Sequence, residues 1–230
     1  MAKSEYVLRL DEVQKALSGH LKQLGFRRAG RTFNRSSETG VVQVINLQTG
    51  PFEVGTPLPP EAAHLRPDLY GQFAINLGVH VSEIYNFVYF PKTFKMVQEY
   101  NCTIRCRLNE ISFSDGHWWS LQTPVGELAD EILRLLSKAG IPFLERYATR
   151  ELIEANWIAD NDSRSRFSNT ARVDVAIMLA SKGNLAKAEE LFASHIALTR
   201  AEMEKGRTGH PGHIAYVKSL AERLGIKLPD

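Results

Sequence analysis

The chain has 230 residues, of which 43% are hydrophobic and 23% charged, and its net charge is +2. This length corresponds to one large domain, or to one domain with an appendage. The small net charge argues against a disordered chain and against a basic nucleic-acid-binding tail. The N-terminus lacks the apolar core of a signal peptide, and no run of about 18 apolar residues could cross a membrane. The sequence therefore predicts a cytoplasmic protein.

The N-terminal part is predicted to contain a helix followed by two strands. Apolar residues at helical spacing predict a helix over 11–24 with Asp11 as its N-cap. Strands are predicted over 31–35 and 41–48, joined by a short polar turn. Residues 51–71 hold five of the ten prolines and are expected to form a long surface loop.

Period-two alternation predicts two further strands, over 73–79 and 102–108, each with one face on the core and the other in water. A hairpin with an Asp115-Gly116 turn follows, and then a helix over 125–138. The predicted fold class is therefore α+β, an antiparallel or mixed sheet with helices on one face. The residues expected in the core are Leu17, Leu21, Ile75, Leu77, Ile104, Leu128 and Ile132.

From residue 149 onward the strand signals stop and helical spacing takes over. Helices are predicted over 149–158, 169–181, 184–204 and 211–224. The expected organisation is an α+β domain over 1–158 and an all-helical, hairpin-type C-terminal extension over 159–230. The helices of the extension are expected to pack on the main domain, because a short isolated helix is marginal in water.

Several ordered segments carry a resemblance to a known family. The strings LGFRRAGRTFNR, VVQVINLQ, CTIRCRL and WWSL resemble an uncharacterised bacterial domain-of-unknown-function family, over about residues 8–158. The resemblance implies that the first two-thirds of the chain form the family domain and that the helical extension lies outside it. It implies no activity.

Arginine and amide side chains on the predicted strands form the main candidate site. Arg105 and Arg107 leave the same face of their strand about 7 Å apart, and no acidic residue lies close to Arg31 in the sequence. If these arginines share one face, their guanidinium groups would suit a carboxylate or a phosphate. Carboxylates from elsewhere in the chain are the rival explanation. The candidate residues for binding an anion or a partner are Arg31, Arg35, Arg105, Arg107, Asn46, Gln48 and Trp119.

Two side-chain pairs allow further expectations. Trp118 and Trp119 are adjacent on a predicted strand, so one should enter the core and the other should point outward. An outward Trp either stacks on a base or a partner, or is covered by the C-terminal helices. Cys102 and Cys106 cannot form a disulfide framework and are expected to be reduced, buried thiols.

Motifs of catalysis are missing from the sequence, which contains no Gly-x-Ser-x-Gly, phosphate-binding loop, dinucleotide motif or Cys-x-x-Cys. The seven histidines are scattered and form no i, i+4 pair, so neither a metal nor a cofactor is expected. Enzyme status stays open, with a non-enzyme favoured. The sequence predicts a non-catalytic binding protein that recognises a protein partner in an immunity- or adaptor-like role. The alternative is a protein that binds an anion, a nucleotide or a nucleic acid through the arginine and amide face.

Overall fold

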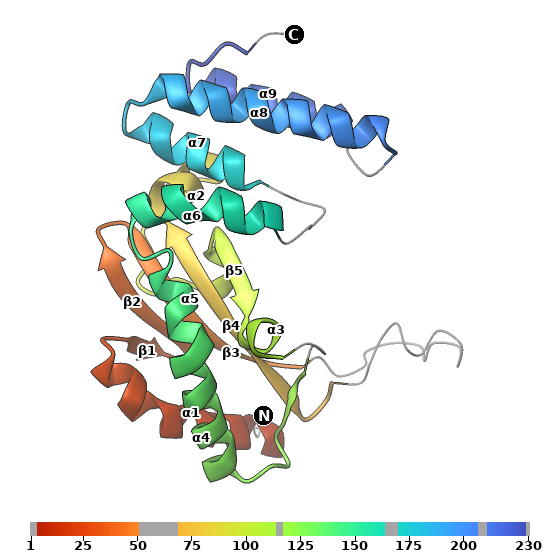
Figure 1. The fold of residues 1–230 in the computed structure, drawn as a ribbon. Helices are drawn as coiled ribbons and strands as arrows, with labels where there is room; N and C mark the ends of the chain where they lie inside the picture. Colours follow the sequence, from red (N-terminus) through yellow and green to blue (C-terminus); the bar gives the residue numbers. More distant parts are fainter. Residues whose placement is uncertain (1–3, 51–68, 114–116, 164–169, 207–210, 229–230) are drawn as a thin grey trace. The chain divides into compact units, whose positions relative to one another are not determined.

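The structure, a computed structural model, divides into two compact units (Figure 1). The first unit is formed by Met1–Ser37, Val42–His80 and Phe94–Glu145, and the second by Glu38–Val41, Val81–Thr93 and Arg146–Asp230. The structure describes residues 4–50, 69–113, 117–163, 170–206 and 211–228. Most of the loop expected over 51–71, and the expected Asp115-Gly116 turn, lie outside these residues.

A six-stranded sheet is the centre of the first unit. Its strands are β1 (Arg27–Ala29), β2 (Thr32–Glu38), β3 (Val41–Thr49), β4 (Gln72–Val81), β5 (Ile104–Arg107) and β6 (Trp119–Ser120). The strand order is β1-β2-β3-β4-β5, and β6 also pairs with β4. The pairs β1–β2, β4–β5 and β4–β6 are antiparallel. Together with the helices, this sheet confirms the predicted α+β fold class.

Helices α1, α4 and α5 lie along one side of the sheet (Figure 1). The helical elements of this unit are α1 (Glu5–Gln23), the 3₁₀ turn η2 (Glu99–Asn101), α3 (Leu108–Ser112), α4 (Val125–Leu135), the π turn η3 (Leu136–Gly140) and α5 (Ile141–Glu145). The expected start of the first helix at Asp11 is wrong, because Ser4 caps α1 by accepting a hydrogen bond from the Val7 amide at 3.4 Å. The helix predicted over 125–138 continues through η3 into α5.

The helix-facing side of the sheet carries the main core, as the alternation predicts. The seven residues expected in the core are all buried, with exposed fractions between 0% and 2%. Leu77 of β4 illustrates the packing, because a Cβ at Gly140 of η3 would lie 3.6 Å from its side chain. The predicted core is therefore confirmed.

The opposite side of the sheet is also covered, so the expectation of a wet face on β4 is wrong. Residues 73–81 of β4 are all buried. The chain before β5 covers this side: His80 contacts the Asn101 carbonyl oxygen at 2.8 Å and the Phe94 ring edge to face. Cys102 packs here as well, beside Val44. Alternation along β4 correctly separated its two faces, but a separate segment of the chain, 94–102, determines whether the second face is exposed.

Gly78 lies where Cys102 of this covering segment approaches the sheet closely. A Cβ atom at Gly78 would lie 2.6 Å from the Cys102 sulfur and 2.8 Å from its Cβ. We therefore expect Gly78→Ala to lower the free energy of unfolding by about 1–3 kcal/mol, the usual cost of overpacking, as measured by urea denaturation. Gly126→Ala in α4 is the control, because a Cβ there meets nothing within 4 Å. Equal unfolding midpoints for the two variants would contradict the predicted close contact.

Two predictions around β5 need correction. The strand was predicted to run over 102–108, but it spans only Ile104–Arg107, because Leu108 begins α3. The predicted hairpin before Trp119 is also wrong in its first half, since Ile111 and Ser112 belong to α3. Both cysteines are free and buried, as predicted.

The second unit is helical. It contains α2 (Ser82–Val88), α6 (Arg150–Ser163), α7 (Ala171–Ser181), α8 (Leu185–Glu204) and α9 (Pro211–Arg223). The four helices predicted after residue 149 are thus confirmed. Helices α6, α2 and α8 pack against α7, and α9 packs against α8. That these helices pack on the sheet domain stays a prediction. Among the residues that the structure describes, no helix combines the length and apolarity needed to cross a bilayer.

Candidate functional site

Two of the four candidate arginines lie on the helix-covered side of the sheet. Arg31 forms an ion pair with Asp11 of α1, with 3.6 Å between Nε and Oδ1. Arg35 of β2 donates a 2.7 Å hydrogen bond to Gln43 and forms an ion pair with Glu145 of α5. Both guanidinium groups therefore have carboxylate partners that are distant in the sequence.

The other two arginines project from β5 to the opposite side. In the β4–β5 register Arg105 lies opposite Gly78, and its guanidinium pairs with Glu99 at 3.3 Å. The guanidinium carbon of Arg107 lies over the Trp118 ring, 5.2 Å from its centroid, which is a cation–π geometry.

Contacts of β2 show that the two arginine pairs face opposite ways. Thr32 and Asn34 hydrogen-bond to Gln98 and Val97, in the segment that covers the Arg105 side. Arg35 is one position from Asn34 and therefore faces the other way. The expected convergence of Arg31 with Arg105 and Arg107 on one face is wrong. The physical reason is that Asp11 of α1 and Glu145 of α5, which are distant in the sequence, pair with Arg31 and Arg35 on the helix-covered side.

The candidate amides lie on the Arg105 side. Asn46 donates to the Thr32 hydroxyl at 2.9 Å, and Asn76 donates to the exposed Gln48 at 2.7 Å. The structure thus brings Asn46 and Gln48 to the side that carries Arg105 and Arg107. It does not bring Arg31 or Arg35 there.

Trp119, one of the candidate binding residues, lies in the core rather than on the surface. Its exposed fraction is 1%, and its ring lies 5.8 Å from that of Phe73, between ring centroids. Trp118 is the partly exposed member of the pair. The sequence predicted that the two rings would separate but could not determine which one would enter the core.

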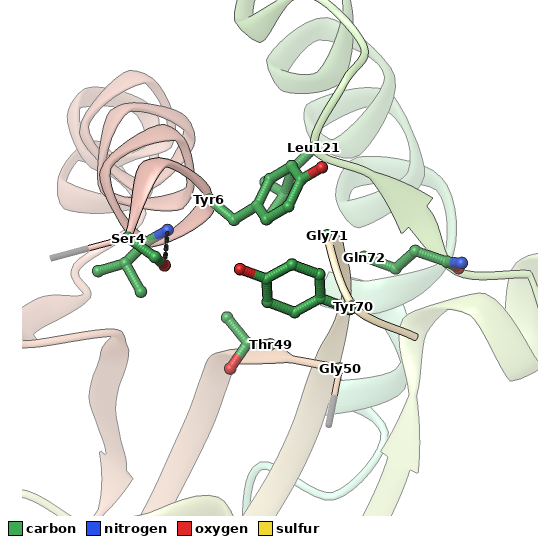
Figure 2. A pocket seen from close by; sticks show the side chains of 9 residues that line it. Ser4, Tyr6, Thr49, Gly50, Tyr70, Gly71, Gln72 and Leu121 are labelled. Carbon is green, nitrogen blue, oxygen red and sulfur yellow. Dashed lines mark hydrogen bonds between the residues drawn. The ribbon is translucent and has the colours of Figure 1, made fainter. Parts of the chain in front are cut away.

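A cavity of about 410 Å³ opens between the start of α1 and the adjoining ends of β3 and β4 (Figure 2). Tyr6 and Tyr70 line it and meet edge to face, with 5.0 Å between ring centroids. Thr49 and Leu121 add to the lining. The volume falls in the range of small-ligand sites, about 300–1,000 Å³. Because none of the described lining residues is Asp, Glu, His, Lys or Cys, the cavity offers apolar contacts and hydroxyls rather than acid–base groups.

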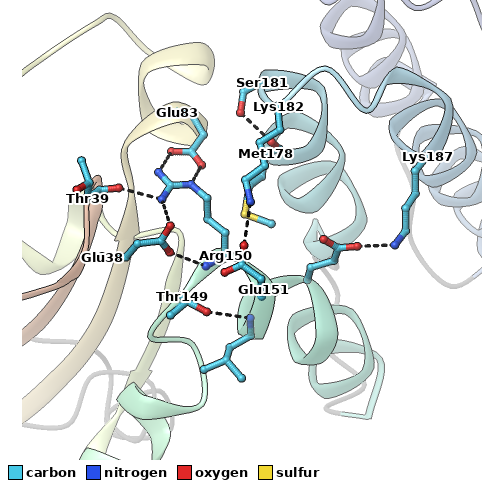
Figure 3. A network of polar contacts seen from close by, with 12 residues as sticks. Glu38, Thr39, Glu83, Thr149, Arg150, Glu151, Met178, Ser181, Lys182 and Lys187 are labelled. Atoms are coloured by element: carbon cyan, nitrogen blue, oxygen red, sulfur yellow. Dashed lines mark hydrogen bonds and ion pairs between the residues drawn. The ribbon is translucent and has the colours of Figure 1, made fainter.

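The second unit contains a polar network centred on Arg150 (Figure 3). The guanidinium makes a two-point contact with Glu83, and a second ion pair joins it to Glu38 at 2.8 Å. It also donates to the Thr39 carbonyl oxygen at 2.9 Å. Although burial opposes ionisation of Glu83, its hydrogen bonds with Arg150 hold the pKa of that carboxyl below its ordinary value. Each of the three guanidinium nitrogens donates at least one hydrogen bond within this network, so we interpret the network as structural.

A group of aromatic rings that the sequence analysis missed begins with the half-buried Tyr85 in α2 and continues with two exposed rings just after this helix. Tyr85, Tyr89 and Phe90, called here the aromatic patch, come from the run YNFVYF. Tyr89 is 62% exposed and Phe90 is 85% exposed. The Tyr85 and Tyr89 rings are stacked at a tilt, with centroids 4.9 Å apart. The four aromatic residues within the six positions of this run were the sequence signal that could have indicated the patch.

The backbone around the aromatic patch is held by specific contacts. The Lys92 amide donates a 2.9 Å hydrogen bond to the Asn86 side chain, which closes the turn after Phe90. Within α2, Ile84 is buried, and the Phe87 ring is covered by the Arg223 guanidinium of α9 at 4.3 Å. The exposed rings are therefore presented by a fixed support.

A buried carboxyl lies on α7. The Asp174 Oδ2 atom accepts hydrogen bonds from the Trp157 indole at 3.2 Å and from the Thr170 hydroxyl at 3.3 Å. Burial raises the pKa of Asp174 to about 7, and the two hydrogen bonds only partly oppose this. The group is thus partly protonated near neutral pH.

Together, the sheet, its covering helices and the helical unit define an α+β protein. Among the residues that the structure describes, the large apolar side chain with the highest exposed fraction is Phe90 of the aromatic patch. Residues 65–146 match the family model described as Domain of unknown function (DUF4304). The predicted resemblance to a domain-of-unknown-function family is thereby confirmed. No curated protein and no solved structure matched the chain.

Proposed function

We propose that this chain is a non-catalytic binding protein that recognises a protein partner through the aromatic patch. The observation that supports the proposal is the exposure of Tyr89 and Phe90, at 62% and 85%, in a segment held by the hydrogen bond from the Lys92 amide to Asn86. Soluble proteins rarely leave adjacent large aromatic rings in water without a partner for them.

Aromatic side chains are the residues that contribute most at protein interfaces. Tyr and Trp are enriched among interface hot spots, and Tyr, Trp and Phe are enriched in interfaces generally. The patch offers two Tyr rings beside Phe90, so it combines apolar area with hydroxyls at the rim. Because the turn is already fixed, little conformational entropy would be lost on binding.

An immunity- or adaptor-like role in the cytoplasm is part of this proposal. The free, buried thiols of Cys102 and Cys106 support a reducing compartment. The alternative of an anion- or nucleic-acid-binding protein required several converging arginines. Arg31, Arg35 and Arg105 already pair with carboxylates, so no observation favours that alternative.

The double substitution Tyr89→Ala and Phe90→Ala is expected to leave folding unchanged and to reduce recovery of the partner more than tenfold. Loss of two hot-spot rings typically costs about 2 kcal/mol or more. The measurement is a quantitative pull-down from the source cells, followed by mass spectrometry. A photo-crosslinking amino acid at position 90 should give a covalent adduct with the same partner.

Tyr100→Ala is the matched control, because this side chain is 71% exposed but belongs to the first unit. It should recover the partner at the wild-type level. If the double variant and the wild type recover the same proteins in equal amounts, the aromatic patch is not the binding surface.

A further inference from the structure

The cavity between the start of α1 and the adjoining ends of β3 and β4 has walls that are held by backbone hydrogen bonds (Figure 2). The Gly50 amide donates to the Gln72 carbonyl oxygen at 2.8 Å, which joins the end of β3 to the start of β4. The Leu121 amide donates to the Gly71 carbonyl oxygen at 2.8 Å, which joins the chain after β6 to the same point. All the described lining residues belong to the first unit. The cavity is therefore preformed, as small-ligand sites usually are.

A glycine at position 71 allows the Tyr6 ring to pack directly on the backbone. Gly71 has a φ of +76°, and a Cβ atom there would lie 2.9–3.1 Å from atoms of the Tyr6 ring. The Tyr70 ring meets that of Tyr6 at an interplanar angle of 88°. In Figure 2 the hydroxyl of Tyr6 points toward Leu121 and that of Tyr70 toward Ser4. The cavity thus has two aromatic walls at a right angle, with hydroxyls that point in opposite directions.

The lining favours an uncharged ligand with an aromatic ring. None of the described lining residues is charged, so an ionic ligand would lose its hydration without gaining a counter-ion. A flat ring would instead gain edge-to-face or offset contacts with Tyr6 and Tyr70, and Val7 adds aliphatic contacts. Since an apolar cavity of about 150 Å³ holds benzene, a cavity of about 410 Å³ has room for two fused rings.

We propose that this cavity binds a neutral small molecule of one or two fused aromatic rings that carries a hydroxyl or N–H group. The rings lie against Tyr6 and Tyr70, and the polar group hydrogen-bonds to the Tyr6 hydroxyl. Among the residues that the structure describes, none forms a hydrogen bond with that hydroxyl, so it is available to a ligand. The cavity belongs to the first unit and the aromatic patch to the second, so this site is additional to the surface proposed for the protein partner.

The experiment titrates the full chain, labelled with nitrogen-15, with two probes that share one ring system. 2-Naphthol is neutral at pH 7, whereas 2-naphthoate carries a carboxylate. We expect 2-naphthol to shift the NMR signals of the Gly50 and Gly71 amides, with a Kd of about 1 mM or lower, as is usual for a ligand of this size. The carboxylate of 2-naphthoate should weaken binding at least about tenfold, because the lining offers it no counter-ion.

Two variants test whether the probe occupies the cavity. Tyr70→Ala removes one aromatic wall and should weaken binding of 2-naphthol about tenfold. The Tyr70 ring is 52% exposed, so the fold should tolerate its loss. Thr49→Trp places a large ring in the cavity and should weaken binding at least as much, and it serves as the test if Tyr70→Ala does not fold. Tyr100→Ala is the control, because this exposed residue of the same unit does not line the cavity.

Equal affinity of the wild type, Tyr70→Ala and Thr49→Trp for 2-naphthol would overturn the proposal. Unshifted Gly50 and Gly71 amides would do the same, as would 2-naphthoate binding as tightly as 2-naphthol. The variant with Tyr89→Ala and Phe90→Ala should bind 2-naphthol as the wild type does. A failure of the partner proposal and a failure of this one are therefore distinguishable.

Discussion

Replacing Arg150 with Met is expected to destabilise the second unit by about 3 kcal/mol, because the carboxylates of Glu38 and Glu83 lose their shared counter-ion. Removing one partner of a buried ion pair costs about 3–5 kcal/mol. The side chains of Arg150 and Glu83 are 13% and 16% exposed, but that of Glu38 is 33% exposed, which favours the lower end of that range. Urea denaturation followed by circular dichroism measures the loss.

Two comparisons make the Arg150 prediction specific. Arg146→Met breaks an ion pair with Asp160, but the Arg146 side chain is 49% exposed, so a much smaller loss is expected. Adding Glu38→Gln and Glu83→Gln to Arg150→Met should recover part of the stability, because no uncompensated charge remains. If Arg146→Met and Arg150→Met lose equal stability, the network does not hold the second unit together.

Asp174→Asn is expected to stabilise the protein at pH 8 and to change stability little at pH 4. The pKa of Asp174 is about 7 in the folded chain and ordinarily 3.8, so the folded chain holds a proton that the unfolded chain releases between these values. The contribution of Asp174 to the free energy of unfolding is complete below about pH 4 and is lost as the pH rises through 7. Each pKa unit corresponds to about 1.4 kcal/mol, so the expected gain at pH 8 is on the order of a few kcal/mol.

The amide is a suitable replacement because it imitates the protonated carboxyl. Its oxygen can accept the hydrogen bonds that Trp157 and Thr170 donate to Oδ2. Stability is compared between variant and wild type at each pH, so that titration of other groups cancels. Glu189→Gln, at an exposed position of α8, controls for a general effect of net charge. A loss of stability that is equal at pH 4 and pH 8 would show that Asp174 is not protonated in the fold.

Local patterns were sufficient to predict most of the fold. Helical spacing located the helices after residue 149, and alternation identified Ile75, Leu77 and Ile104 as core, because these signals depend on neighbours within one or two turns. The end of the strand at Arg107 could not be predicted, since the continuing alternation at Leu108 is also compatible with a helix start. The covering of the second sheet face could not be predicted either, because it depends on the distant segment 94–102.

The candidate site was predicted less well, because it depends on contacts between distant residues. Arg35 pairs with a carboxylate 110 positions away, so the absence of acidic neighbours in the sequence did not mean an absence of partners. The aromatic patch, in contrast, is a local run and could have been found from the sequence.

The division of the chain has a consequence for how the protein is made. The second unit takes Glu38–Val41 and Val81–Thr93 from the middle of the first unit's sequence, and its remaining part begins at Arg146. On the ribosome, Glu38 and Glu83 emerge well before Arg150, their shared counter-ion. The nascent chain must therefore carry these carboxylates without Arg150 until the later helices are synthesised. For the same reason, a fragment that stops at residue 145 would contain Glu38 and Glu83 but lack the arginine that forms ion pairs with both.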